Sequence, residues 1–315
     1  MSNYSDSAFT KDENSSWFKV FKLIKPGSKV LDVGCSSGTF GKVLIDEKKC
    51  VVHGIEIDES DRREAGEKLQ KVFPYNIETD KLDGLDNNYD YIYFGDVIEH
   101  LVNPGPSLKR IAPYLKKDGR LLFSVPNMTH GLVRLMMLQG RFEYGETGLL
   151  DKTHLHFYDY DLLQSALNQG GFEVDVIDPV KKDIPVQVIK QELAKVGLKS
   201  TDAFVEYLRE SHASYYQFVG SAKKVKEGAV SAPKPLEVSS PVDLFQTYLD
   251  NTVKYYEDTI AAQKAQNKDM AEKYKQYEKL EQDLIASKKE LDDIKSSKSW
   301  KMVENLRRVK HMGRE

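Results

Sequence analysis

The sequence is poor in cysteine, in long apolar runs and in excess charge of either sign. Its two cysteines, Cys35 and Cys50, show neither a paired nor a metal-ligand spacing, which excludes a disulfide framework and predicts a reducing, cytoplasmic environment. No stretch approaches the roughly 20 apolar residues that cross a bilayer, and the polar first residues do not form a secretion signal. A net charge of −3 provides no chain-wide basic field for nucleic acid.

Residues 17–225 alternate short apolar runs with helix-like stretches. This pattern predicts an α/β domain over residues 1–225, with a mostly parallel sheet flanked by helices. We expect strands at residues 30–33, 51–55, 89–94, 120–125, 172–177 and 215–219, and helices at residues 40–47, 61–72 and 107–115. Residues 185–212 look helical and are predicted to form an insertion.

The composition changes after this domain. Residues 226–241 are rich in Gly, Ala, Ser and Pro, which predicts a linker, whereas residues 242–296 contain neither Pro nor Gly. A seven-residue register, interrupted by Gln263, predicts a long coiled-coil helix that joins copies of the chain or an assembly complex. A second set of apolar residues follows the members of this register by four residues before Tyr277 and by three residues after it, which suggests an irregularity in the coiled coil. A single solvated amphipathic helix is the alternative. The register comprises Leu249, Tyr256, Met270, Tyr277, Leu284 and Leu291.

The last segment, residues 297–315, carries six basic residues against two acids. Trp300, Val303 and Leu306 recur every three residues, which predicts a short basic amphipathic helix. Such a tail would contact the inner face of an anionic membrane or a partner protein, and a solvated helical end is the plainer alternative.

A glycine-containing turn follows the first expected strand. Asp32 lies near the end of that strand, and Gly34 and Gly38 precede an expected helix, so the backbone can pass close to a ligand. The spacing is not the dinucleotide fingerprint, and no Gly-Lys-Ser/Thr of a phosphate-binding loop follows. About 20 residues on, Glu56 follows the second expected strand, where a carboxylate accepts hydrogen bonds from a ribose diol. Its neighbour Ile57 would pack on adenine.

These two elements, followed by Asn76–Thr79 and Gly95–Leu101, resemble class I S-adenosylmethionine (SAM)-dependent methyltransferases over residues 17–176. The resemblance implies a Rossmann-like fold with SAM as cofactor. The glycine loop would contact the methionine part and Glu56 the ribose, while Asn76 stands where the family usually carries an adenine-contacting aspartate. The cofactor-binding residues predicted in this way are Asp32, Gly34, Cys35, Gly38, Glu56, Ile57, Asn76, Ile77, Gly95 and Asp96.

Methyl transfer from a sulfonium requires alignment and a deprotonated acceptor, and histidine is the commonest base. We choose His154 as the base, with Asp151 to orient it and His100 as the second candidate; a structural role for each histidine is the alternative. His154 and His156 would share one strand face if their segment is extended. The spacing Asp151-x-x-His154-x-His156 also suggests a metal site, but no third clear ligand cluster accompanies it, and we predict no metal.

The stretch Gly140–Tyr144, followed by Gly148–Leu155, resembles methyltransferases of bacterial surface-polysaccharide and glycan pathways. The tail resembles segments found after coiled coils in bacterial glycan-assembly enzymes. Phe142, Tyr144 and Tyr158 would stack on a sugar face, and core packing explains them equally well. We therefore predict a cytoplasmic SAM-dependent O-methyltransferase that acts on a saccharide of a cell-surface glycan.

Two other hypotheses are open. The acceptor would instead be a small molecule such as a quinone or natural product, or the domain would be an inactive scaffold that acts through its coiled coil. A nucleobase acceptor is disfavoured, because Gly95-Asp96-Val97-Ile98 replaces the Asn-Pro-Pro-aromatic stretch of amino-methylating enzymes. The coiled coil argues against a freely diffusing acceptor, and the intact glycine loop with Glu56 argues against the scaffold.

Overall fold

The computed structural model describes residues 9–210, 212–225 and 244–296. The chain divides into two compact units, Met1–Val238 and Ser239–Glu315, which are described separately. The strands are β1 (Lys29–Val33), β2 (Val51–Ile55), β3 (Lys71–Phe73), β4 (Tyr89–Gly95), β5 (Leu115–Pro126), β6 (Phe172–Ile177), β7 (Val180–Lys181) and β8 (Tyr215–Lys224). The α-helices are α1 (Ser16–Leu23), α2 (Thr39–Lys48), α3 (Glu59–Lys68), α4 (Pro104–Ile111), α5 (Gly131–Leu138), α6 (Tyr160–Gln169), α7 (Val186–Ala194), α8 (Asp202–Glu210) and α9 (Leu244–Ser296). Short 3₁₀ turns are η1 (Ile98–His100), η2 (Ala112–Tyr114) and η3 (His212–Ser214).

In the described residues, the strands form one mixed sheet in the order β3-β2-β1-β4-β5-β8-β6, with β7 paired to β8. β1 to β5 pair in parallel, whereas β8 runs antiparallel to β5, β6 and β7. The strand order reverses between β1 and β4, and ligands of such sheets bind in the crevice at that reversal. The predicted Rossmann-like, mostly parallel sheet flanked by helices is confirmed.

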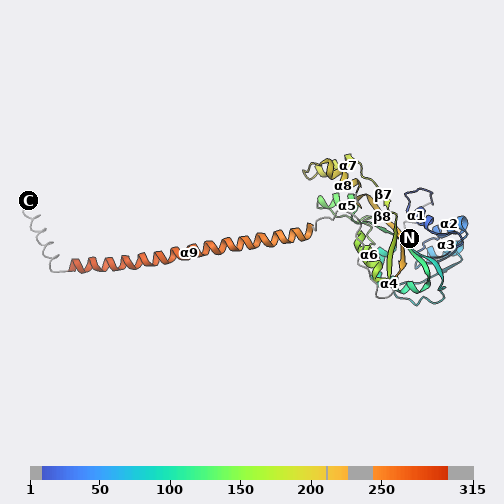
Figure 1. Ribbon diagram of the computed structural model, residues 1–315, viewed down its shortest axis with the longest axis horizontal. Coiled ribbons are helices and arrows are strands. Elements are labelled where there is room, and N and C mark those ends of the chain that lie inside the picture. Colours follow the sequence, from blue (N-terminus) through green and yellow to red (C-terminus); the bar gives the residue numbers. More distant parts are fainter. Residues whose placement is uncertain (1–8, 211, 226–243, 297–315) are drawn as a thin grey trace, which may run out of the picture. The chain divides into compact units, whose positions relative to one another are not determined.

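Successive strand residues face opposite sides of the sheet, so each central strand contributes to two hydrophobic clusters. Leu31 and Ile92 pack in the cluster covered by α4 and α6, whereas Val30 and Tyr91 pack in the cluster covered by α1, α2 and α3. Figure 1 shows these two groups of helices on opposite sides of the strands. Burial on both faces explains why the central strands are apolar at nearly every position.

Several expected elements differ from the structure at their ends. The helix expected at residues 107–115 is α4, which ends at Ile111, and the strand expected at residues 120–125 is β5, which already begins at Leu115. The helix expected at residues 61–72 ends at Lys68, and Lys71–Phe73 adds the edge strand β3 beside β2. A three-residue strand has too few residues to show a period of its own. The strand expected at 215–219 continues to Lys224, because β8 pairs with β5 on one side and β6 on the other along this length.

The stretch in which we expected a helical insertion contains α7 and α8. Together with α5 they enclose a separate small cluster of buried residues that includes Leu135, Ile189 and Leu208. In Figure 1 these three helices lie next to one another, away from α1 to α3. None of the described helices combines the length and the apolar composition that crossing a bilayer requires.

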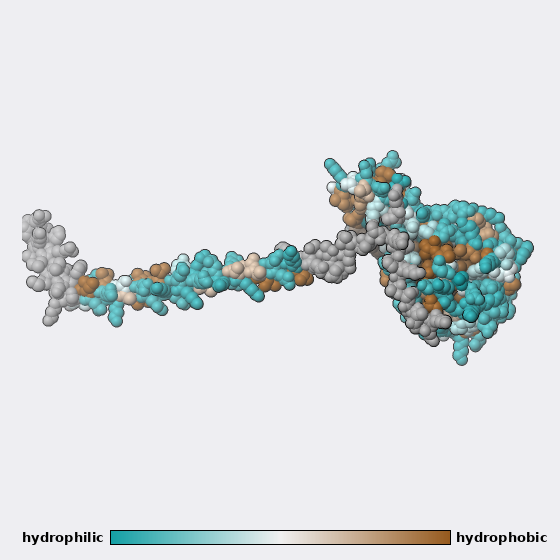
Figure 2. Space-filling model, viewed as in Figure 1, coloured by the Kyte–Doolittle hydropathy of each residue, from teal (hydrophilic) through white to brown (hydrophobic). Residues whose placement is uncertain are grey.

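The second unit contains α9, one continuous helix of 53 residues. The described members of the predicted register, from Met270 to Leu291, are 48% to 70% exposed. Figure 2 shows hydrophobic side chains scattered among hydrophilic ones along the helix. The predicted linker at 226–241 and the predicted basic tail at 297–315 lie outside the described residues.

Replacing Leu121 in β5 by Ala tests how far the central strands hold the domain together. Leu121 is fully buried, so Leu121→Ala should lower the free energy of unfolding by about 2–5 kcal/mol. The matched control is Leu132→Ala on α5, whose side chain is 43% exposed and whose loss should cost less than about 1 kcal/mol. Urea unfolding followed by fluorescence measures both, and equal losses would contradict this account.

Candidate active site

The carboxyl ends of three central strands meet at one edge of the sheet. Because the strands are parallel, Val33 at the end of β1 pairs with Ile55 of β2 on one side and Phe94 of β4 on the other. The residues that follow these positions therefore surround the crevice where the strand order reverses. The predicted cofactor residues at this edge are Gly34, Cys35, Gly38, Glu56, Ile57, Gly95 and Asp96.

The glycine loop after β1 depends on two left-handed residues, Gly34 (φ 71°) and Gly38 (φ 74°). A Cβ on Gly34 would lie 2.6 Å from Cγ2 of Val97, so the loop passes close to the turn that follows β4. Gly38 precedes the first residue of α2. The loop is thereby held against the turn after β4, next to a helix N-terminus.

Glu56 follows β2 at this edge, where we expected a ribose ligand. Its Oε2 accepts the Ser36 N–H (2.9 Å) and its Oε1 accepts the Asp58 N–H (2.8 Å), which fixes the carboxylate across the glycine loop. A carboxylate accepts about four hydrogen bonds, so each oxygen retains capacity for one hydroxyl of a diol. Ile57 beside it is 66% exposed, an apolar surface that an adenine ring would cover. These residues fit the ribose and base of SAM.

One buried and one half-buried acid line the same edge. Asp32 is 4% exposed, and burial, followed by the charge of Glu56, raises its pKa to about 7. Burial raises the pKa of Asp96 to about 6, although Ser124 and Gln217 donate hydrogen bonds to its Oδ1. Asp96 also has a left-handed backbone (φ 54°), which is uncommon for a residue other than glycine and is characteristic of functional turns. Acids of this kind are suited to a cationic ligand.

The two residues predicted at the adenine differ in what their side chains offer. The side chain of Ile77 is 5% exposed and packs in the core, so any contact with the cofactor falls to its backbone. Asn76 is exposed, but its Oδ1 already accepts the Glu78 N–H at 2.9 Å. An Asx-type turn therefore uses the amide oxygen that we expected to meet adenine.

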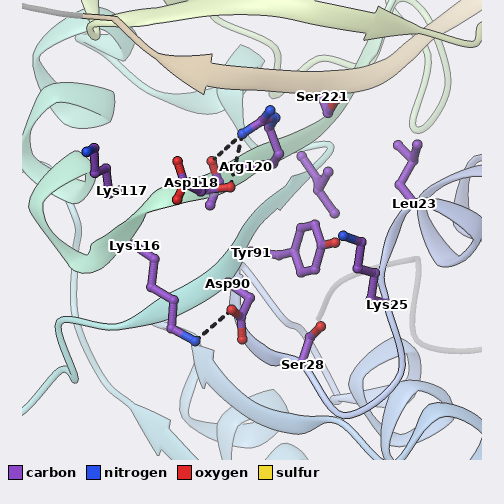
Figure 3. Close-up of a pocket in the computed structure, with 12 residues that line it drawn as sticks. Leu23, Lys25, Ser28, Asp90, Tyr91, Lys116, Lys117, Asp118, Arg120 and Ser221 are labelled. Carbon is purple, nitrogen blue, oxygen red and sulfur yellow. Dashed lines mark hydrogen bonds and ion pairs between the residues drawn. The ribbon is translucent and has the colours of Figure 1, made fainter.

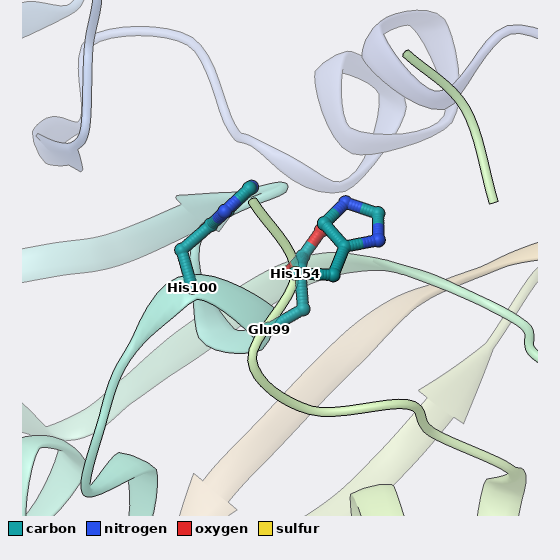
Figure 4. Close-up of side chains that lie close together, drawn as sticks. All are labelled: Glu99, His100 and His154. Carbon is teal, nitrogen blue, oxygen red and sulfur yellow. The ribbon is translucent and has the colours of Figure 1, made fainter. Parts of the chain in front are cut away.

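Just beyond Asp96, the structure brings together Glu99 and His100 of η1 with His154 of the loop between α5 and α6. One nitrogen of each ring and one carboxylate oxygen lie within 4.8 Å of one another, and the ring centroids are 4.9 Å apart. Figure 4 shows the three side chains gathered in one place. The loop is held there because the Glu99 carbonyl accepts the N–H groups of Leu155 (2.9 Å) and His156 (3.1 Å).

Burial controls the charge of this group of side chains. Glu99 is 1% exposed, and burial, followed by the charge of Asp96, raises its pKa well above the usual value. His154 is 7% exposed, and burial, followed by the charge of His100, lowers its pKa. Burial therefore disfavours the charged forms of both Glu99 and His154.

The structure gives Asp151 a different partner from the one we predicted. Its Oδ1 accepts the N–H (2.8 Å) and the hydroxyl (2.7 Å) of Thr153, and the Thr153 carbonyl accepts Nδ1–H of His100 at 3.1 Å. Nδ1 of His154 instead donates to the Leu149 carbonyl at 3.3 Å. Asp151 thus supports His100, because its short side chain reaches the N–H two residues on more readily than the next imidazole.

His156 and Tyr158 do not have the places that we expected. The segment wraps around η1 and forms no strand, and Nε2 of His156 donates to the Val102 carbonyl at 3.3 Å, away from His154. Tyr158 is 4% exposed and belongs to the core, so its ring is not available to a sugar. Both outcomes follow from the contact between the loop and η1, which residue spacing alone does not reveal.

Two residues of the site were not among our predictions. Glu99 stands next to His100 in the sequence, and its place directly after the apolar pair Val97-Ile98 was the available signal. Gln217 in β8, whose Nε2 donates to Asp96 at 2.7 Å, lies 121 residues further along the chain. No local pattern indicates that contact, because the antiparallel insertion of β8 beside β5 creates it.

A separate pocket lies at the opposite edge of the sheet (Figure 3). Its lining includes Ser28 before β1, Asp90 at the start of β4 and Arg120 in β5. Two of its basic side chains are already paired, Lys116 with Asp90 and Arg120 with Asp175, both at 2.6 Å. Because it lies at the amino ends of the parallel strands, it is not the site formed by the glycine loop.

The reversed strand order, the glycine loop after β1, the acid after β2 and the antiparallel β8 together define a Rossmann-like, SAM-dependent methyltransferase domain. The family described as methyltransferase domain matches residues 10–176, more than half of the chain. The chain belongs to this methyltransferase-domain family.

Individual proteins are similar to parts of the chain. It is 30% identical over 125 residues to phosphoethanolamine N-methyltransferase 2 of Caenorhabditis elegans, covering 38% of this chain and 29% of that protein. It is 27% identical over 214 residues to phosphoethanolamine N-methyltransferase 1 of Arabidopsis thaliana, covering 66% and 40%. The chain therefore spans about a third of the length of these curated relatives. A SAM-dependent methyltransferase structure from Archaeoglobus fulgidus is 19% identical, with a TM-score of 0.48, covering 67% of this chain and 92% of that one.

The Glu56 carboxylate provides a direct test of the cofactor site. Glu56→Gln removes the charge that would accept two ribose hydroxyls, and a hydrogen bond to a charged group contributes about 1.5–3 kcal/mol. SAM affinity, measured by titration calorimetry, should therefore fall about 10- to 100-fold. The control is Glu59→Gln, an exposed residue of α3 paired with Arg63, which should leave the affinity unchanged. Wild-type affinity in Glu56→Gln would rule out this ribose site.

Proposed function

We propose that the protein transfers the methyl group of SAM to a hydroxyl of a saccharide acceptor. The observation that carries the proposal is the position of Glu99, His100 and His154, which lie together directly after Gly95 and Asp96 at the cofactor edge. Groups that handle a proton are thus located where an acceptor would meet the methyl group.

Bound SAM supplies a methyl carbon on a sulfonium, whose sulfur leaves with the electron pair of the broken C–S bond. The acceptor oxygen forms the new C–O bond and loses its proton. We assign that proton to the imidazole pair, and to His154 first, because its lowered pKa keeps the ring neutral and able to accept. Nδ1–H of His154 is directed to the Leu149 carbonyl, which leaves Nε2 as the accepting nitrogen.

Aromatic side chains near this site suit a sugar face. Phe142 and Tyr144 are 41% and 60% exposed, and both pack against Phe157 of the loop that carries His154. The Phe142 and Tyr144 rings meet edge to face, with centroids 5.4 Å apart. Exposed rings held by a third ring offer a rigid apolar surface next to polar groups, which is the surface that saccharides require.

A second candidate function is methylation of an amine. The curated relatives are phosphoethanolamine N-methyltransferases, which align with 125 and 214 residues of this chain. An ammonium acceptor must also lose a proton before transfer, so the imidazole pair would serve it as well. The two candidates differ in the acceptor atom, which assays can separate.

The full chain should methylate sugar hydroxyls when incubated with labelled SAM and a panel of nucleotide- and lipid-linked saccharides. Phosphoethanolamine, tested in parallel, should give no labelled product. His154→Ala should lower kcat about 10²- to 10⁴-fold, the usual contribution of a general base. The matched control is His156→Ala, which removes an imidazole two residues away and should retain activity. Label transfer to phosphoethanolamine and to none of the saccharides would contradict this proposal and favour methylation of an amine.

We also propose that α9 joins copies of the chain as a coiled coil. Its described apolar side chains are about half exposed or more, and an unpartnered helix with such a stripe leaves much apolar area in water. Association would place several methyltransferase domains on one assembly, which suits an acceptor that is large or tethered.

In the full chain, the double substitution Leu284→Lys and Leu291→Lys should reduce the mass in solution to that of a monomer. Two charges on the seam oppose association, whereas Gln282→Lys with Ala286→Lys adds the same charges off the seam and should leave the mass unchanged. Light scattering coupled to size exclusion measures the mass. A monomeric wild-type chain would refute the coiled coil.

A further inference from the structure

The proposed reaction does not explain the environment of the Glu99 carboxyl group. The side chain is 1% exposed, and within the part of the chain that the structure describes neither of its oxygens has a hydrogen-bond partner. A buried carboxyl group without partners costs free energy, and native proteins normally satisfy such groups with a donor, a water or an ion. Both nearby imidazoles already use Nδ1 elsewhere and present the lone pair of Nε2, so a carboxylate beside them needs a shared cation, either a proton or a metal ion.

The two histidines are oriented in the way that metal ligands are. Nδ1 of His100 lies 3.1 Å from the Thr153 carbonyl, and Nδ1 of His154 lies 3.3 Å from the Leu149 carbonyl. A carbonyl only accepts, so each Nδ1 carries the proton and each Nε2 keeps its lone pair. Metal-binding histidines typically donate their second ring N–H to a backbone carbonyl or carboxylate, which fixes the tautomer and the ring.

A further layer of contacts supports His100. The Asp151 carboxylate holds the N–H and the hydroxyl of Thr153, and Thr153 in turn accepts the His100 proton. This chain from a carboxylate through a neutral residue to an imidazole is the kind of outer support that raises ligand basicity. It also explains the position of Asp151, which we had expected to orient His154.

We propose that Glu99, His100 and His154 bind one divalent transition-metal ion, such as zinc, next to the SAM site. Two imidazole nitrogens and one carboxylate form the three-ligand set of catalytic metal sites, which leave further positions open. The ligand atoms lie within 4.8 Å of one another. Two metal–ligand bonds of about 2.1 Å bring such atoms within about 4.2 Å, so small side-chain rotations suffice.

The ion gives the buried carboxyl group its missing partner and alters the role of His154. A hydroxyl held at the open position loses its proton more readily, because a bound dication lowers the pKa of a coordinated oxygen. His154 would then be a ligand in place of a base. The metal-binding site itself does not depend on which acceptor is methylated, and only the role of the ion rests on the proposed function.

The site can be tested by metal binding in the full chain, with no acceptor present. Protein stripped with a chelator should take up one Zn²⁺ per chain by calorimetry, and Co²⁺ should produce visible absorption bands of a site with nitrogen ligands. His100→Ala and His154→Ala should each weaken Co²⁺ binding at least about tenfold, since mutation of a ligand costs more than mutation of its outer support. Glu99→Gln should shift the Co²⁺ spectrum and weaken binding.

The control His156→Ala removes a histidine of the same loop that lies outside the group and should bind Co²⁺ as the wild type does. SAM affinity in each variant shows that the domain is folded. Equal Co²⁺ binding by wild type and His100→Ala, or equal loss in His156→Ala, would overturn the metal site. Metal binding without methylation of any saccharide would leave the site standing and reject the proposed acceptor.

Discussion

The parallel pairing of β1 with β2 and β4 is the constraint on which the rest of the site depends. Alignment of Val33 with Ile55 and Phe94 places three strand ends at one edge, and everything that follows those ends meets there. Backbone hydrogen bonds fix this register, and burial on both faces protects it, because a slip by one residue would move every apolar side chain to the other side. The glycine loop, Glu56 and Asp96 are thus positioned by the sheet itself.

The turn after β4 joins the two halves of the site. Asp96 adopts a left-handed backbone and is held by Ser124 of β5 and Gln217 of β8. Three residues later Glu99 enters the core, and its carbonyl anchors the loop of His154. A buried acid and a strained turn cost stability, and such costs are usually found where a ligand is bound. The cofactor edge and the proposed acceptor side therefore share one short segment.

The acids at this edge of the sheet would favour cationic ligands. Burial raises the pKa of Asp32 to about 7 and that of Asp96 to about 6, and a sulfonium or ammonium of SAM nearby would favour their ionised forms. Glu99 is buried still more completely beside two imidazoles. Positive charge on the bound ligands would stabilise the ionised carboxylates, which burial alone destabilises. This is a reason for the protein to retain these acids.

The alternation of strands and helices, the glycine loop with Glu56, and the continuous helix at residues 244–296 could be predicted from the sequence. These features are local: a period of two or seven residues, or a turn beside a strand, is visible within a short window. Four features follow only from the packing of the folded chain: Glu99 joins the histidines, Asp151 supports His100, Tyr158 lies in the core and Gln217 donates to Asp96. Those outcomes depend on how a loop 50 residues away and an antiparallel strand dock against η1 and β5, and such contacts leave no periodic trace in the chain.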